Sequence, residues 1–349
     1  MGHTPQLDDD YNPPGQADSG GLPRAAKKNR ARWFGLFTVC LAIVLLYLAL
    51  RDVNWKEFLA ILSQGRYILF PVVFAWSSLN QYNRAFRWRL LLKAEKPLPS
   101  QTVFWANMVG NLANAFLPAR AGELIRSVAL GYSAQISSSF VLATALTERL
   151  MDVVVLVMLG SVALLSLPGL LPGLAQALQG MAVLGMVGVL VLLATPHMQW
   201  LLQKLLDAVP LPGEWRARLQ QLMVRFLDGM RSLHDPRRAA LFIAMTLGIW
   251  LMDGVGLMIG AVMLNLHLTL PQALLLLVGL GLSSALPSTP GYVGVFQFVA
   301  VFILTPFGFS ASEAVAFILV MQAINYLMVT VWGVVGIWRL NLWGWLQAR

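Results

Sequence analysis

Long apolar stretches alternate along the chain with short polar ones, and basic residues gather at the borders between them. The apolar stretches cover residues 33–50, 67–92, 138–166, 177–195, 239–264 and 312–338. A helix needs about 20 mostly apolar residues to cross the hydrocarbon core of a bilayer. We therefore expect each stretch to form a membrane-spanning helix and the fold to be an all-α, polytopic membrane helix bundle.

Two further apolar segments are interrupted near their middles. Residues 101–131 break at AFLPARAGE (115–123), and residues 272–308 break at ALPSTPGYVG (285–294). Proline removes a backbone donor and glycine admits sharp turns, so a continuous helix is disfavoured at both places. The direction of the neighbouring spans requires each segment to begin and end on the same side of the membrane. Each is therefore predicted to form a hairpin of two half-helices, either re-entrant or fully spanning.

The two broken segments occupy equivalent places in two groups of helices. Spans 67–92 and 138–166 flank the first, and spans 239–264 and 312–338 flank the second. The groups cross the membrane in opposite directions, which is typical of an inverted-topology repeat. Irregular backbone at membrane depth has to be buried in protein or line a wet cavity. We expect Pro118–Gly122 and Pro287–Gly294 to face such a cavity, and two ordinary proline kinks are the alternative.

Composition agrees with a membrane protein. Of the 349 residues, 58% are hydrophobic and 12% are charged, against roughly 25% charged residues in a soluble domain. The net charge of +9 comes from basic residues at the ends of apolar stretches, a positive-inside pattern that argues against nucleic acid as a partner. It predicts the cytoplasmic membrane as the location, with both termini in the cytoplasm. The only cysteine is Cys40 and the four histidines are scattered, so we expect no disulfide, no metal site and no cofactor.

The chain is predicted to have three parts. Residues 1–30 form a disordered cytoplasmic tail rich in Pro, Gly and Asp, residues 31–340 form the membrane domain, and residues 341–349 form a short cytoplasmic tail. Within the membrane domain, residues 197–238 make a basic cytoplasmic loop with apolar residues at helical spacing over 215–233. This amphipathic helix is expected to lie on the inner membrane surface, and a partner-binding site is the alternative.

Three charged residues lie deep in one predicted span. Glu148, Arg149 and Asp152 belong to span 138–166, and ten residues of helix place Glu148 about 15 Å from its start. A charge facing lipid at that depth costs roughly 2.5–3.5 kcal/mol on insertion scales. These side chains must therefore face protein or water. Glu148 and Asp152 share a helix face, and the spacing allows Arg149 to pair with Asp152.

Further polar residues on neighbouring segments are expected to complete this site. Span 67–92 carries a polar stripe of Asn80, Asn83, Arg84 and Arg87, and the first break adds Arg120, Glu123 and Arg126. Together they predict a polar interior with a surplus of positive charge, suited to a phosphate because Arg offers paired donors to its oxygens. A network of buried ion pairs without a ligand is the alternative. Asp253, Gln297, Gln322 and Asn325 are expected to form interhelical hydrogen bonds.

Four short motifs in order resemble a known family. They are Arg87-Trp88, then Pro118, Arg120, Gly122 and Glu123, then Glu148, Arg149 and Asp152, and finally Pro287, Pro290, Gly291 and Gly294. Over about residues 35–340 the chain resembles the transmembrane domain of lysylphosphatidylglycerol synthases, a flippase-like family with stand-alone members. The resemblance implies translocation of a lipid or lipid-linked molecule. Nothing here corresponds to the soluble aminoacyl-transferase domain of the synthases, and Gln297 stands near where many relatives carry an acidic residue.

These features predict a flippase that moves a phospholipid or lipid-linked anionic substrate, rather than an enzyme. Arg120, Arg126 and Arg149 would engage the phosphate, while the acyl chains stay in the lipid. One alternative is a non-transporting scaffold that binds a cytoplasmic lipid- or glycan-modifying enzyme through helix 215–233. A further alternative is an intramembrane transferase with Glu148 or Asp152 as general base, for which the sequence offers no nucleophile.

Overall fold

The computed structural model describes residues 39–117, 121–166, 235–284 and 290–342, together with isolated positions between 183 and 233. Regular structure in these ranges is helical, with no strand, which confirms the predicted all-α class. The predicted tail 1–30, nearly all of span 177–195 and of helix 215–233, and most of the tail 341–349 lie outside the described residues.

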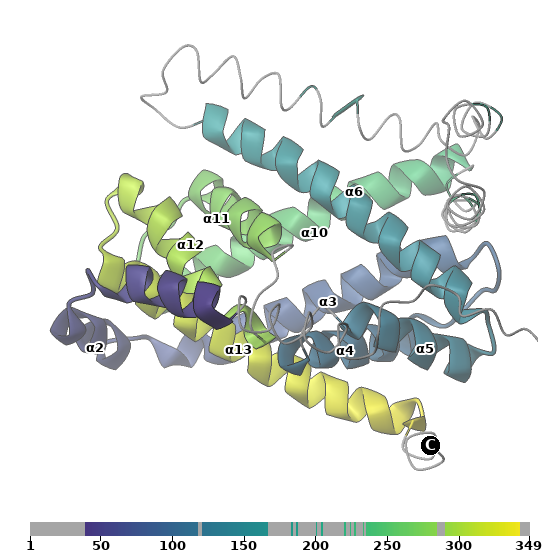
Figure 1. Ribbon diagram of the computed structural model, residues 1–349, viewed down its shortest axis with the longest axis horizontal. Coiled ribbons are helices and arrows are strands. Elements are labelled where there is room, and N and C mark those ends of the chain that lie inside the picture. The colour runs from purple at the N-terminus through teal and green to yellow at the C-terminus, as the bar shows by residue number, and fades with distance from the viewer. Residues whose placement is uncertain are drawn as a thin grey trace, which may run out of the picture.

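The helices follow one another in the order labelled in Figure 1. They are α2 (Trp55–Ser63), α3 (Phe70–Leu92), α4 (Ser100–Phe116), α5 (Gly122–Ala134), α6 (Ser138–Leu165), α10 (Pro236–Met263), α11 (Leu270–Ser283), α12 (Val295–Leu304) and α13 (Ala311–Arg339). Three short 3-10 helices in the described ranges are η1 (Tyr67–Leu69), η4 (Pro290–Tyr292) and η5 (Thr305–Phe307). An apolar helix over Val39–Leu50 precedes them.

Four of the predicted spans are single long helices. They correspond to α3, α6, α10 and α13. The side chains of Ser137, Asp235 and Ser310 accept backbone N–H groups in the first turns of α6, α10 and α13, so polar caps fix where these helices begin. Between the first two predicted spans lies one more helix, α2, which is capped at its start by the side chain of Asn54.

The long helices differ in how apolar they are. Among the described residues, α10 and α13 are each long and apolar enough to cross a membrane, and α2 with η1 and α3 passes the same test as a pair bent by 60°. Helix α6 is as long as α10, at 28 residues, but it includes the charged residues Glu148, Arg149 and Asp152. Its charges therefore need partners inside the bundle.

Both broken segments form hairpins, as predicted. In the first, Asn107 of α4 bonds Arg126 of α5, and Asn114 near the end of α4 bonds the backbone of Gly122 at the start of α5. In the second, Gly279 of α11 lies against Val299 and Ile303 of α12. The two contacts of the first hairpin run in reversed order along α5, so α4 and α5 are antiparallel half-helices, and in the second hairpin α11 packs along α12.

The two groups of helices pack in a two-fold pattern. Helix α3 packs on α10, α4 packs on α13, and α11 packs on α6. In this pattern α3 corresponds to α10, α4 to α11 and α6 to α13. Exchanging each helix for its counterpart leaves the pair of α3 and α10 unchanged and turns the pair of α4 and α13 into the pair of α11 and α6. All three pairs are antiparallel, since Trp76 and Arg87 of α3 meet Met252 and Thr246 of α10 in reversed order, and the other pairs behave alike. The rotation axis therefore lies across the helices, as in an inverted repeat.

Apolar cores occupy the two ends of this bundle. One is built around Trp88, Met108 and Phe242, and the other around Leu304 and Phe317. Figure 1 shows both hairpins converging with α3 and α13 between these ends. The helix middles are left for the polar side chains, which form the site described next.

Candidate functional site

Arg87 is the most deeply buried charge of the site. Its side chain is 0% exposed, and it donates to Asp152 Oδ1 at 2.5 Å, to Glu148 Oε1 at 2.7 Å and to Thr246 Oγ1 at 3.0 Å. The guanidinium thus joins α3 to α6 and α10. Because it pairs with both carboxylates on the shared face of α6, it offsets part of the cost of burying them.

Arg126 and Arg149 form the next layer toward the cavity. Arg126 lies 2.6 Å from Glu123 and 3.2 Å from Glu148, above the ring of Trp88 at 4.5 Å. Arg149 pairs with Glu123 at 2.7 Å. The spacing allowed Arg149 to pair with Asp152, but Arg149 pairs instead with Glu123 of α5, while Asp152 pairs with Arg87 of α3.

A third ion pair joins α3 to α10. Arg84 pairs with Asp253, which also accepts from Asn80 Nδ2 at 2.6 Å, and the guanidinium lies 5.0 Å from the centre of the Trp250 ring. The polar stripe predicted on α3 therefore faces α6 and α10. Asp253 takes part in an interhelical contact, as predicted.

The charges of the described site balance. Its arginines are Arg84, Arg87, Arg126 and Arg149, and its carboxylates are Glu123, Glu148, Asp152 and Asp253. The predicted surplus of positive charge is therefore not a property of these residues, because Asp253 adds a carboxylate that the prediction left out. Arg120, which would add one positive charge, lies outside the described residues.

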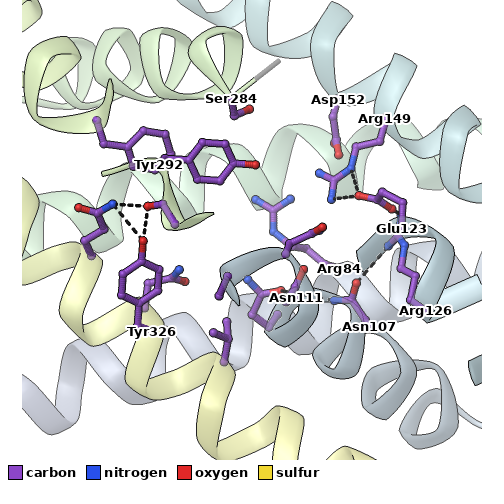
Figure 2. Close-up of a pocket in the computed structure, with 18 of the residues that line it drawn as sticks. Arg84, Asn107, Asn111, Glu123, Arg126, Arg149, Asp152, Ser284, Tyr292 and Tyr326 are labelled. Atoms are coloured by element: carbon purple, nitrogen blue, oxygen red, sulfur yellow. Dashed lines mark hydrogen bonds and ion pairs between the residues drawn. The ribbon is translucent and has the colours of Figure 1, made fainter. Parts of the chain in front are cut away.

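A cavity of about 330 Å³ opens beside these ion pairs. The tips of both hairpins reach it: Asn114 and Ala115 come from the end of α4, and Gly291 and Tyr292 from η4. Figure 2 shows Glu123, Arg126 and Arg149 on one side and Tyr292 and Tyr326 on the other. The volume falls within the roughly 300–1,000 Å³ typical of small-molecule pockets.

The structure brings half of the predicted site residues to the cavity wall. These are Arg84, Glu123, Arg126, Glu148, Arg149, Asp152 and Gly291. Arg87 lies beneath the wall, and Gly122, Pro290 and Gly294 belong to the helix start and turn beside it. Pro118, Arg120 and Pro287 lie outside the described residues.

Hydrogen bonds to α13 hold the second turn in place. Gly291 and Gly294 have φ of 74° and 88°, a left-handed backbone that glycine adopts at little cost. The carbonyl of Gly291 accepts from Tyr326 and, at 2.7 Å, from Gln322 Nε2. Gln297 links the turn to Gln322 by bonds of 2.7 Å to the Gly294 N–H and to the Gln322 amide oxygen. The interhelical bonds predicted for Gln297 and Gln322 are thus present.

Several wall residues were not predicted. Six carboxamides line the cavity, namely Gln81, Asn107, Asn111, Asn114, Gln322 and Asn325, together with the aromatic residues Trp250, Tyr292, Phe296 and Tyr326. A signal for three of them exists in the sequence, since Asn107, Asn111 and Asn114 follow the i, i+4, i+7 spacing of one helix face. Within the described ranges, no group of three or more His, Cys, Asp or Glu side chains could hold a metal ion.

The fold and this site define a multi-pass, all-α membrane protein with a polar cavity between two opposed hairpins. A family model described as the lysylphosphatidylglycerol synthase transmembrane region matches residues 33–333. The chain belongs to this family, which confirms the resemblance found in its motifs. No curated protein and no solved structure matches it.

Proposed function

We propose that the protein is a flippase that moves a phospholipid or a lipid-linked anionic molecule across the cytoplasmic membrane, and that it is not an enzyme. The observation that carries this proposal is the cavity of about 330 Å³ where the tips of two opposed hairpins meet charged side chains. Paired broken helices in inverted repeats are where transporters of this architecture bind their substrates.

Arg149 is the residue best placed to receive the anionic group. Its side chain is 39% exposed, against 3% for Arg126 and 16% for Arg84. A phosphate that approaches Arg149 replaces Glu123 as its acceptor, while Glu123 keeps its second partner, Arg126. Exchange of one acceptor for another binds the headgroup without holding it too tightly for release. Transport requires this balance.

The remaining parts of the mechanism follow from the size and symmetry of the site. A cavity of this volume takes a headgroup and leaves the acyl chains in the surrounding lipid. The two inverted groups of helices would rock about the cavity and expose it to each leaflet in turn, with both termini on the cytoplasmic side.

Substituting Arg149 by Ala tests the proposal. Purified protein in vesicles with a trace of acyl-labelled phosphatidic acid is mixed with an impermeant quencher, and the rate at which inner-leaflet label becomes accessible is measured. Loss of a hydrogen bond to a charged group predicts a rate about 10- to 100-fold lower. Arg238→Ala, which breaks an exposed pair with Asp235, should keep the wild-type rate.

Two results would count against a flippase. Equal translocation rates for Arg149→Ala and wild type would mean that the lipid headgroup does not pass through the cavity. If the wild type moves no lipid, the scaffold role becomes the better account, and it predicts that deleting residues 215–233 releases a bound lipid-modifying enzyme.

A further inference from the structure

The cavity has two chemically different ends, and the second end lacks charge. We propose that the headgroup carries, beyond its phosphate, a part with several uncharged hydroxyl groups, such as an inositol, a glycerol or a sugar, and that this part binds between η4 and α13. This inference rests on the proposed function, because it names the substrate class of the same site.

The two ends come from different halves of the fold. The first repeat supplies every charged side chain of the wall, namely Arg84 from α3 and Glu123, Arg126, Glu148, Arg149 and Asp152 from α5 and α6. The second repeat supplies Ser284, Tyr292, Phe296, Gln322, Asn325 and Tyr326 from hairpin 272–308 and α13. No side chain in this second set is charged at neutral pH, so it offers hydrogen bonds without an ionic partner.

Two polar groups of the uncharged end have no hydrogen-bond partner among the described residues. Asn325 is exposed on α13 and lines the cavity. The Tyr292 hydroxyl points into the cavity between Ser284 and Arg84 in Figure 2. A carboxamide and a phenol each donate and accept, as a hydroxyl group does. These two side chains therefore suit a ligand with several adjacent hydroxyl groups better than a ligand that can only donate or only accept hydrogen bonds.

The position of Tyr292 is set by its backbone and by a neighbouring ring. Its φ is 59°, a left-handed value that is rare for a bulky residue and is often kept at functional sites. Its ring stacks on Phe296 with centroids 4.8 Å apart and planes 6° from parallel. This fixed pair presents an apolar face beside the polar groups, which suits the C–H face of a sugar or inositol ring.

An ammonium headgroup fits this end less well. An ammonium group binds most strongly to a free carboxylate, but each of the four carboxylates of the site is already paired with an arginine. The other way to bind such a headgroup is through aromatic faces, which attract quaternary ammonium groups. Phosphatidylcholine is therefore the comparison that decides between the two chemistries.

The test compares lipids that share acyl chains and differ in headgroup. Wild-type vesicles carry traces of acyl-labelled phosphatidylinositol, phosphatidylglycerol, phosphatidic acid or phosphatidylcholine, and translocation rates are measured for each. The two hydroxyl-bearing lipids should move faster than phosphatidic acid and phosphatidylcholine. Tyr292→Phe and Asn325→Leu each remove one hydrogen-bonding group, and each should lower the ratio of the phosphatidylinositol rate to the phosphatidic acid rate by about two- to tenfold.

The matched control is Tyr47→Phe, on the exposed face of helix Val39–Leu50, which should keep the wild-type ratio. Equal rates for all lipids, or fastest movement of phosphatidylcholine, would overturn this inference and leave the flippase proposal standing. If no lipid moves in the wild type, the proposed function itself fails, so the two failures are distinct.

Discussion

At the residue scale, Arg87 shows how charge is kept inside the bundle. It is wholly buried and bonds Glu148 and Asp152 together. Replacing it by Met would leave two buried carboxylates without their main partner, and we expect a loss of roughly 3–5 kcal/mol in the free energy of unfolding. Denaturant unfolding in detergent measures this loss.

Arg238→Ala is again the control, because exposed pairs contribute only about 0–1 kcal/mol. A stability of Arg87→Met within about 1 kcal/mol of the wild type would contradict this account of a buried ion pair.

Which residues are polar inside the membrane could be predicted from the sequence, but which residues pair could not. The depth of Glu148 and Asp152 in an apolar span was sufficient to place them in the interior. The partner of Arg149 depends on where α5 lies, and helical spacing within α6 carries no information on that. The balance of charge was misjudged for the same reason, since Asp253 lies far along the chain and reaches Arg84 only through the packing of α3 on α10.

At the element scale, close approach of α4 and α5 closes the first hairpin. Gly122, at the start of α5, faces Gly110 of α4, and a Cβ at Gly122 would overlap the Gly110 carbonyl oxygen and the Asn114 side chain. Backbone cannot yield as a flexible side chain does. We expect Gly122→Ala to destabilise the protein by about 1–3 kcal/mol, as overpacking does, and thermal unfolding in detergent measures the shift.

Gly248→Ala gives the matched comparison within a helix. A Cβ at Gly248 in α10 meets nothing within 4 Å, so the substitution should be neutral or stabilise by up to about 1 kcal/mol through helix propensity. If the two substitutions change the stability equally, the close contact between α4 and α5 is not the reason that glycine is needed at position 122.

The long helices and both hairpins followed from the sequence because apolar length and the Leu-Pro breaks are local signals. Helix α2 was missed because its 9 residues are too few for an apolar span and begin within a polar loop. The uncharged end of the cavity was missed because Tyr292 and Phe296 resemble ordinary apolar residues of a membrane helix. Only the fold brings them beside Tyr326 and Asn325.

At the scale of the whole molecule, transport requires the two repeats to move against each other. Helix α6 of the first repeat lies against α11 of the second, and a Cβ built on Gly160 would be 3.4 Å from the Cβ of Val278. Disulfides join Cβ atoms about 3.5–4.5 Å apart. Gly160→Cys with Val278→Cys, in a Cys40→Ser background, should therefore form a disulfide and tie the repeats together.

Oxidation should stop lipid translocation by this variant, and reduction should restore it, with formation of the bond followed by thiol alkylation and mass spectrometry. Either single Cys variant should transport equally well under both conditions. Undiminished transport with the disulfide fully formed would mean that α6 and α11 do not move apart, and that rocking of the repeats is not the mechanism.

The central claim is that the cavity between the two hairpins is a path for lipid headgroups across the membrane. The most direct measurement is the translocation rate of acyl-labelled phosphatidylinositol in vesicles that contain the wild-type protein, compared with protein-free vesicles. The account predicts that inner-leaflet label becomes accessible to the impermeant quencher in the protein-containing vesicles and remains protected in the others. The account is contradicted if the inner-leaflet label is equally protected in vesicles with and without the protein, for phosphatidylinositol and for phosphatidic acid alike.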